Sequence, residues 1–311
     1  MRSVKAFAPA TVANVSCGFD ILGFAIDAMG DTVELVLKDE PGLVVVSIDG
    51  DGGKLPLEAE KNTCAVAIQA MLDELDSKVG MNIYLAKGLP LGSGMGSSAA
   101  SAVAALAAAN RLLGDPFEKK DLLPFAIAAE KVACGAGHAD NVAPSLLGGF
   151  VLVRDYHPLD VIKLPVPNGL YCTLLHPHYE LKTADSRSVL RDQIPMKHAT
   201  IQSGNVAGLI AGLYESDFQL ISRSLRDVIA EPYRAVLLPG FYEVREALKA
   251  AGALGMGISG SGPTLFALSL GKEIAEAVGA AGKEIFSKIG LDVDVYFSEI
   301  NTRGAYVIEE K

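Results

Sequence analysis

Residues 90–100 form the stretch whose residue types most directly suggest chemistry, with the sequence Pro-Leu-Gly-Ser-Gly-Met-Gly-Ser-Ser-Ala-Ala. Glycine at every second position leaves the backbone free to adopt positive φ and to approach a ligand closely. The alanine-rich run 99–113 that follows predicts a helix. Free amides at the start of a helix, together with the positive end of its dipole, bind anions such as phosphate. A glycine-rich turn that holds no ligand has the same composition, so other parts of the chain must decide between the two.

Two common nucleotide-binding motifs can be compared with this loop. The Walker A motif needs Gly-Lys-Ser/Thr, and no lysine stands at that position. Residues 94–99 do fit the dinucleotide pattern G-x-G-x-x-A, and Asp115 follows at about the distance of a ribose-binding carboxylate. Asp115, however, precedes Pro116 in a turn after a helix, and the loop begins only at residue 90. The Walker A motif is therefore excluded, and a dinucleotide site is disfavoured.

The serines beside the glycines suggest a metal ion. A hydroxyl near phosphates can ligate Mg²⁺, which usually takes only one or two ligands from the protein. Ser97 and Ser98 are in the right place, and Glu130, on a predicted helix rich in alanine, is a candidate for a second ligand. The more ordinary interpretation of Glu130 by itself is a solvated residue paired with Lys131.

The elements that must position these residues fall into two halves, because 311 residues are at the upper limit for a single core. The predicted elements of the first half are strands at 2–8, 31–38, 43–49, 81–87 and 150–154, helices at 62–75 and 99–113, a helical region kinked or split at Pro124, and a loop at 135–149.

The second half has a different predicted order of strands and helices. Its predicted elements are strands at 170–175, 254–259, 263–269 and 292–298, with helices at 184–192, 197–213, 217–229, 240–251 and 272–288. Without the extra helices, this is the β-α-β-β-α-β order of a split βαβ sandwich. The proline-containing segment 155–168 is predicted to connect the halves, so we expect an α+β chain with domains at 1–160 and 161–311.

Charge and cysteine content exclude several classes of function. Lys and Arg number 27 against 37 Asp and Glu, and a net charge of −10 argues against a nucleic-acid or membrane-surface binder. No signal peptide is evident, and the longest apolar run, 99–109, is too short to span a bilayer. The cysteines at 17, 64, 134 and 172 form no paired metal motif. We expect a cytoplasmic protein with reduced thiols.

Two further Gly/Ser-rich loops accompany residues 90–100, at 9–20 and 257–263. In order along the chain they contain P-A-T-x-A-N-x-x-x-G-F-D, P-x-x-x-G-M-G-S-S-A-A and G-I-S-G-S-G-P-T. This set resembles the three motifs of the small-molecule kinases that include galactokinase, homoserine kinase, mevalonate kinase and phosphomevalonate kinase. The resemblance implies an N-terminal domain like a ribosomal-protein S5 module and a ferredoxin-like C-terminal domain.

Within this superfamily the chain is most similar to the homoserine kinases. The matching segments are Asn14 and Asp20, Gly137-His-Ala-Asp-Asn141, Thr183 to Arg187, and Glu231-Pro-Tyr-Arg234 with Leu-Leu-Pro-Gly240. The resemblance implies ATP and Mg²⁺ as cofactors, with Ser98 and Glu130 holding the metal. The nucleotide-binding residues that it implies are Asn62, Lys87, Pro90, Leu91, Gly92, Ser93, Gly94, Met95, Gly96, Ser97, Ser98, Ala99, Ala100, Ser259 and Gly260.

The acceptor that this resemblance implies is L-homoserine, a zwitterion with a side-chain hydroxyl. Its ammonium needs an anion, for which Asp20 and Asp140 are suited. Its carboxylate needs a cation, and the guanidinium groups of Arg187 and Arg234 match a carboxylate with two hydrogen bonds. Asn14 could orient the substrate.

A general base is harder to assign. Mevalonate kinase and galactokinase relatives have an aspartate where this chain has Asn141, and an amide cannot accept a proton at neutral pH. We hypothesise that no side chain fully deprotonates the hydroxyl, and that its proton passes to the phosphoryl oxygen in a loose transition state. Asn141, Thr183 and Arg187 are the expected catalytic residues, with Asp140 as the alternative base and His138 as a structural residue.

The sequence therefore predicts an ATP-dependent kinase that forms O-phospho-L-homoserine for threonine biosynthesis, and relatives suggest a homodimer. A kinase of the same superfamily acting on shikimate or an isoprenoid precursor is one alternative. A regulatory relative that has lost catalysis is another.

Overall fold

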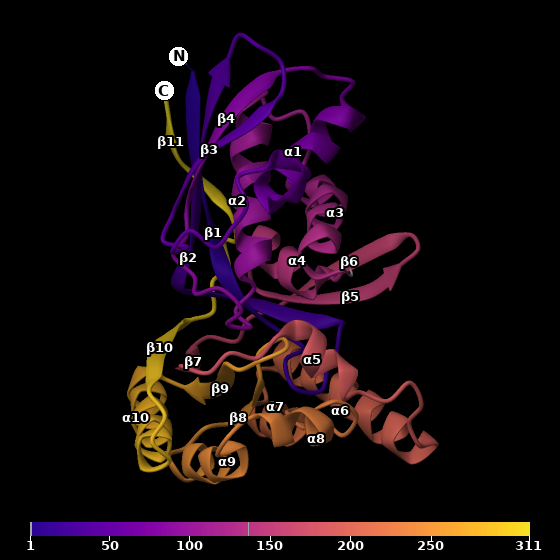
Figure 1. Cartoon of the computed structure of the whole chain (residues 1–311). Coiled ribbons are helices and arrows are strands. Elements are labelled where there is room, and N and C mark those ends of the chain that lie inside the picture. The colour runs from indigo at the N-terminus through magenta and orange to yellow at the C-terminus, as the bar shows by residue number, and fades with distance from the viewer. Residues whose placement is uncertain (1, 136) are drawn as a thin grey trace.

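The computed structural model describes residues 2–135 and 137–311, arranged as two layers of sheet and helix, one above the other in Figure 1. Within these residues seven strands form the first sheet, in the order β11-β1-β2-β4-β3, with β5 paired to β2 and β6 paired to β5. The strands are β1 Ser3–Ala13, β2 Leu22–Lys38, β3 Leu43–Asp49, β4 Gly80–Ala86, β5 Phe150–Tyr156, β6 Leu159–Leu164 and β11 Tyr306–Glu310.

Helices cover one face of this sheet (Figure 1). They are α1 Thr63–Glu74, α2 Ser97–Leu112, α3 Leu123–Cys134 and α4 Ala139–Leu147, with 3-10 turns η1 Ala59–Lys61 and η2 Lys119–Leu122. The alanines of α2 let it pack closely between α1 and strands β1 and β2, so nearly all of the helix is buried. Asn62 caps α1 by accepting a hydrogen bond from the Cys64 amide at 3.0 Å.

The second sheet contains β7 Leu170–Pro177, β8 Gly255–Ile258, β9 Leu265–Leu270 and β10 Val293–Glu299, in the order β10-β7-β9-β8. All of its pairs are antiparallel. Helix α10 Lys272–Lys288 packs on this sheet and on α9 Phe241–Ala250, which lies near β8. The predicted β-α-β-β-α-β order is confirmed. Between β7 and β8 the chain inserts α5 Thr183–Ser188, α6 Met196–Glu215, α7 Phe218–Ser224, α8 Glu231–Arg234 and η3 Ala235–Leu237.

Strand β1 continues past Pro9, where the sequence predicted its end. The register between β1 and β2 shifts between Pro9 and Thr11, so the proline lies at an irregularity of the ladder. A proline lacks the amide hydrogen that a regular ladder needs, and a bulge is where that loss is tolerated. The extension to Ala13 carries the first Gly/Ser loop to the edge of the second layer.

Four other segments differ from the expectations. The predicted loop at 135–149 contains helix α4, and residue 136 within it lies outside the described residues. The predicted connector at 155–168 contains β6, because His157-Pro158 forms the turn of a β5–β6 hairpin. The last strand, β11, pairs with β1, so the chain crosses between the layers after β6 and again after β10. Pro124 lies in the first turn of α3, where it is tolerated, and does not split that helix.

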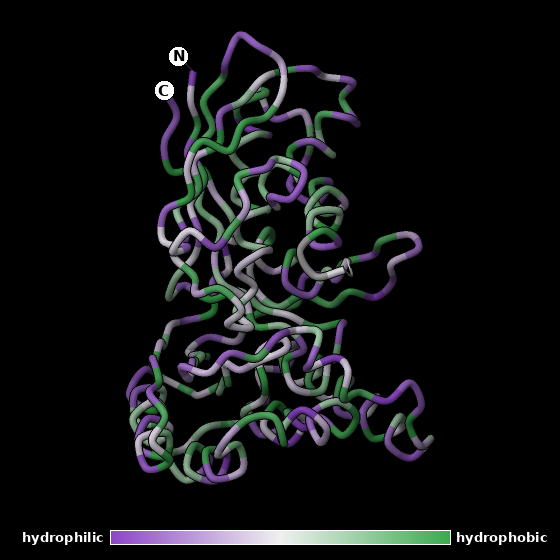
Figure 2. Tube along the Cα trace, viewed as in Figure 1, coloured by the Kyte–Doolittle hydropathy of each residue, from purple (hydrophilic) through white to green (hydrophobic). Residues whose placement is uncertain are grey.

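The apolar residues gather between each sheet and its helices, as Figure 2 shows in green along the inner strands and helix faces. The ring of Phe24 on β2 contacts Phe150 at a tilt and Phe266 of the second sheet edge to face, and so joins the two layers. Cys17, Cys64 and Cys172 are buried free thiols, and the side chain of Cys134 lies outside the part of the chain described. In the described residues, none of the helices has the length and apolar character needed to cross a membrane.

Candidate active site

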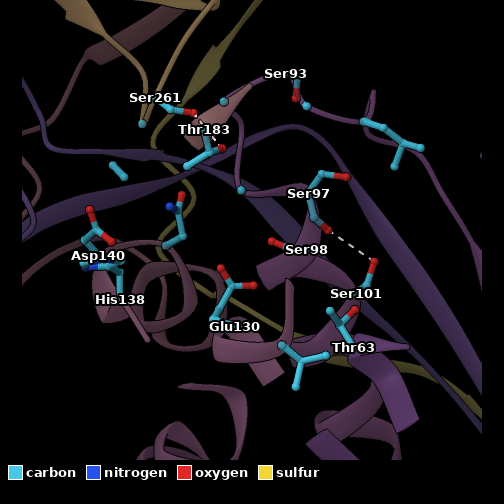
Figure 3. A pocket seen from close by; sticks show the side chains of 18 of the residues that line it. Thr63, Ser93, Ser97, Ser98, Ser101, Glu130, His138, Asp140, Thr183 and Ser261 are labelled. Atoms are coloured by element: carbon cyan, nitrogen blue, oxygen red, sulfur yellow. Dashed lines mark hydrogen bonds between the residues drawn. The ribbon is translucent and has the colours of Figure 1, made fainter. Parts of the chain in front are cut away.

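A cavity of about 480 Å³ lies between the two layers, and all three Gly/Ser loops contribute to its walls. Figure 3 shows its polar side chains converging from the start of α2, from α3, from the start of α4 and from the late loop. The predicted site residues that line it are Asn14, Asp20, Asn62, Lys87, Leu91, Gly92, Ser93, Gly94, Gly96, Ser97, Ser98, Glu130, Asp140, Asn141, Thr183, Arg187, Arg234 and Gly260.

Five predicted nucleotide-binding residues are not among those lining residues: Pro90, Met95, Ala99, Ala100 and Ser259. All of them except Pro90 are fully buried. Pro90 and Met95 belong to the glycine loop itself, Ala99 and Ala100 lie at the start of α2, and Ser259 donates a hydrogen bond to the Gly94 carbonyl.

The glycine loop adopts the backbone that its composition predicted, with φ of +64° at Gly92, +79° at Gly94 and +69° at Gly96. A Cβ atom at Gly96 would lie 2.0 Å from Thr11 Oγ1, and one at Gly94 would lie 2.5 Å from the Ser259 carbonyl oxygen. Glycine is therefore required at both positions by close approach as well as by φ.

Hydrogen bonds join the three loops into one unit. Ser259 Oγ donates to the Gly94 carbonyl at 2.7 Å, and the Thr11 amide donates to the Met95 carbonyl at 3.1 Å. Asn14 Nδ2 donates to the Gly260 carbonyl at 2.8 Å, which links the early and late loops. The late loop belongs to the second layer, so these bonds fix the cavity wall across the junction of the two layers.

The early loop is strained. Asn14, Val15, Ser16 and Asp20 all have positive φ, between +42° and +70°. This is unusual for any residue but glycine and an outlier for the β-branched Val15. Asn14 Oδ1 accepts a hydrogen bond from the Asp20 amide at 2.9 Å, and this bond holds Asp20 in place. Strain of this kind persists only where the surrounding structure enforces it, and it concentrates at functional sites.

At one end of the cavity, Asp20 and Arg187 pair directly. Arg187 donates from Nη2 to Oδ1 of Asp20 at 3.0 Å and from Nη1 to Oδ2 at 3.3 Å. Arg187 Nη2 also lies 2.8 Å from His138 Nε2, which must accept because a guanidinium only donates. Burial lowers the pKa of His138, which favours this neutral form. The guanidinium groups of Arg187 and Arg234 both lie over the ring of Phe19.

Asp140, in the first turn of α4, faces the same region (Figure 3). Asp140 is only 3% exposed. This burial, reinforced by the negative charge of Asp20, raises the pKa of the Asp140 carboxyl to about 7. Among the described residues, no group hydrogen-bonds to its Oδ1 atom. A carboxyl group of this kind can gain or lose a proton near neutral pH.

Asn141 and Thr183 are held by neighbouring hydroxyls. Thr11 Oγ1 donates to Asn141 Oδ1 at 2.7 Å, and Asn141 is one of the residues that line the cavity. The hydroxyls of Thr183 and Ser261 lie 3.2 Å apart (Figure 3). Both residues can therefore donate hydrogen bonds into the cavity.

Ser98 and Glu130 offer oxygen ligands beside the glycine loop. Figure 3 shows the Ser98 hydroxyl at the start of α2 and the Glu130 carboxylate on α3 directed toward the same region. Glu130 is only 5% exposed and lines the cavity, so it is not the solvated residue of the alternative interpretation. A hydroxyl and a carboxylate are ligands that fit Mg²⁺, with phosphate oxygens and water completing the shell. Among the described residues, no group of three or more His, Cys, Asp or Glu side chains could hold a metal ion.

Comparison with known proteins places this geometry in a family. Residues 62–149 match the model for the GHMP kinases N terminal domain, and residues 209–288 match that for the GHMP kinases C terminal. The homoserine kinase of Chlorobium phaeobacteroides strain DSM 266 is 53% identical, over 99% of this chain and 100% of its own length. The chain belongs to the homoserine kinase family.

Other members of the homoserine kinase family and of its fold extend the comparison. The homoserine kinase of Xylella fastidiosa strain M12 is 40% identical over 99% of this chain and 94% of its own. The crystal structure of homoserine kinase from Cytophaga hutchinsonii matches with a TM-score of 0.96 at 56% identity, over 98% of this chain and 97% of that one. The crystal structure of L. major mevalonate kinase, with a TM-score of 0.70 at 17% identity over 95% of this chain and 96% of that one, shares the fold. The predicted resemblance and the two-domain α+β fold are confirmed.

Several residues that shape this site carry little or no signal in the sequence. Thr11 and Phe19 lie within the first motif, and their place in it was the available signal. Asp31 gave no signal, because it reads as an ordinary acidic residue at the start of a predicted strand. In the structure it is fully buried and paired with Lys87. Lys87 lines the cavity, but its side chain is only 1% exposed and its ammonium lies within that ion pair.

Proposed function

We propose that this protein transfers the γ-phosphoryl group of ATP to the side-chain hydroxyl of L-homoserine, giving O-phospho-L-homoserine for threonine biosynthesis. One observation carries the proposal: a single cavity is lined both by the glycine loop and by the Asp20–Arg187 pair. The first can bind phosphates and the second can bind a zwitterion. The names of the full-length relatives give independent support.

The nucleotide end would act through backbone amides. The loop amides and the start of α2 point positive dipoles at the phosphates, and several such interactions must act together because each contributes about 0.3–2 kcal/mol. Mg²⁺, when bound, would neutralise phosphate charge, and Ser98 and Glu130 are the residues that would hold it. Phosphoryl transfer requires mainly positioning and charge neutralisation from the protein.

The acceptor end would recognise both charges of homoserine. Its ammonium would approach Asp20, and its carboxylate would approach Arg187 and Arg234, so the substrate's two charges replace the contacts that Asp20 and Arg187 now make with each other. Shikimate and isoprenoid alcohols lack the ammonium group and would leave Asp20 uncompensated. Asn141 and Thr183 would orient the hydroxyl toward the γ-phosphorus.

In the transfer, the hydroxyl oxygen forms a bond to the γ-phosphorus while the bond to the ATP bridging oxygen breaks. The hydroxyl proton passes either to a phosphoryl oxygen or to Asp140, whose pKa of about 7 suits it to accept a proton. We favour direct transfer to the phosphoryl oxygen, and the Asp140 variants discussed below distinguish the two routes.

A coupled assay for ADP release over homoserine, shikimate, mevalonate and galactose tests the proposal. We expect homoserine to give the highest kcat/KM. A preference for another alcohol would refute the substrate, and activity on none of the four would refute the kinase function. We further propose that the protein is a cytoplasmic homodimer. Light scattering at several protein concentrations measures the molar mass and so tests the oligomeric state.

A further inference from the structure

A buried ion pair lies next to the glycine loop, between Asp31 on β2 and Lys87 just after β4, with side chains 0% and 1% exposed. The proposed transfer uses neither residue. Lys87 Nζ donates to Asp31 Oδ2, to the Ser97 carbonyl at 2.9 Å and to Ser101 Oγ at 2.9 Å. An ammonium group has three hydrogens to donate, so protein acceptors engage all of them.

The carboxylate oxygens of Asp31 also have hydrogen-bond donors at all of their acceptor positions. Its Oδ1 atom accepts from the Gly88 amide at 3.0 Å and the Leu89 amide at 3.2 Å. Its Oδ2 atom accepts from Lys87 and from Ser101 Oγ at 2.6 Å. A carboxylate has about four acceptor positions, and these four bonds occupy them.

The network reaches both ends of the glycine loop. Asp31 holds the backbone at 88 and 89, immediately before the loop. Lys87 holds the carbonyl of Ser97, the first residue of α2, immediately after it. One buried carboxylate on β2 therefore fixes the span across which the loop must bend.

We propose that Asp31, acting through Lys87, is a positioning residue that presets the glycine loop for the phosphates of the nucleotide, and that Lys87 is not itself a phosphate ligand. The proposal rests on the proposed function only in taking ATP as the nucleotide. A loop whose ends are fixed in advance loses less conformational entropy when the ligand binds, so it binds more tightly. Removing one partner of a buried pair leaves the other charge uncompensated, which disturbs the site locally.

The test compares D31N, K87M and the D31N/K87M double variant. The amide side chain in D31N keeps one carbonyl oxygen for the amides of Gly88 and Leu89, so this variant tests the charge. Titration calorimetry measures the dissociation constant of ATP without homoserine, and steady-state assays give the KM of each substrate. D217N is the matched control, because Asp217 caps α7 through the Leu220 amide and lies outside the cavity lining.

We expect D31N and K87M each to weaken ATP binding by about tenfold or more, with the KM for homoserine within about threefold of the wild type. The double variant should bind ATP within about threefold of K87M, because the two residues act as one unit. D217N should bind ATP as the wild type does. If Asp31 and Lys87 only stabilised the fold, the variants would change the KM of both substrates and the melting temperature, and the effect would not be specific to ATP.

The opposite results would overturn the proposal. If D31N binds ATP as tightly as the wild type, or more tightly, Asp31 competes with phosphate for Lys87. If D31N does not fold, the double variant decides, since it removes both charges. A further loss of about tenfold beyond K87M would show that Asp31 acts independently. A wild type that binds ATP but does not phosphorylate homoserine refutes the proposed function and leaves this proposal standing.

Discussion

Arg187 on α5 and Asp20 in the early loop form a two-point ion pair across the junction of the two layers, with nitrogen–oxygen distances of 3.0 and 3.3 Å. Each residue neutralises the charge of the other. A zwitterionic substrate offers both partners a replacement at once, whereas a substrate with a single charge would leave one of them unpaired.

The negative charge of Asp20 can be removed while the size of its side chain is kept. Asp20→Asn should raise the KM for homoserine by about tenfold or more while the KM for ATP stays near the wild-type value, because the lost charge belongs to the proposed acceptor site. Steady-state kinetics with each substrate varied in turn measures the split. Asp294→Asn, which removes an exposed carboxylate paired with His178, is the control and should change neither constant. An equal rise in both KM values would contradict the assignment.

Asp140 gives a prediction for stability against pH. Its pKa is about 7 in the folded chain and ordinarily 3.8, so the folded state binds more protons between these values. The stability linked to this group is therefore fully present below about pH 4 and is lost as the pH rises to about 7, to a total of roughly 4 kcal/mol. Asp140→Asn should be more stable than the wild type at pH 8, by chemical denaturation. Equal stability of the variant and the wild type at pH 8 would contradict the raised pKa of Asp140.

The same variant separates the two proton routes. If Asp140 accepts the proton, kcat of the wild type falls below about pH 7, and Asp140→Asn loses kcat while the KM for homoserine is unchanged. If Asp140 instead binds the ammonium, the KM rises and kcat keeps its pH dependence. Asn141→Ala complements this test, and retention of most of kcat would support direct transfer to the phosphoryl oxygen.

Gly96→Ala should be strongly destabilising and inactivating. The new Cβ would collide with Thr11 Oγ1 and break its hydrogen bond to Asn141, at a position with positive φ. We expect a loss of about 2–4 kcal/mol in stability, against about 1 kcal/mol for Gly114→Ala. Gly114 is the matched control, since it also has positive φ but its Cβ would meet nothing within 4 Å. Similar melting temperatures for the two variants would refute the steric argument.

Glu130→Gln tests the metal assignment. The amide keeps the size of the side chain but loses the charge that a hard cation prefers. We expect kcat to fall by about 100-fold and the Mg²⁺ concentration for half-maximal activity to rise, while the affinity for ATP without Mg²⁺ changes little. Calorimetric titrations with and without the metal separate these effects. An unchanged Mg²⁺ requirement would remove Glu130 from the proposed ligands.

The glycine loop, the helix after it and the β-α-β-β-α-β order could be predicted from the sequence because each depends on local chemistry. Gly92, Gly94 and Gly96 allow a backbone that few other residues adopt, and the alanines of α2 favour a helix wherever they lie. The sharing of one cavity by the three loops could be inferred only from the resemblance to a family.

Other features depend on contacts between distant residues. The role of Asp31 requires Lys87, 56 positions away, and Ser101, 70 positions away. Helix α4 is short, and its small and polar composition is typical of a loop, but packing against β1 and β2 stabilises it. Strand β11 is mostly exposed, so it carries little of the apolar alternation that identifies a strand.

The pairing of β11 with β1 has a consequence for how the chain is assembled. The Ser3 amide donates to the Lys311 carbonyl at 2.9 Å, and the two termini lie side by side in Figure 1. Because this ladder pairs residues about 300 positions apart, the first sheet cannot be completed during synthesis until β11 has left the ribosome.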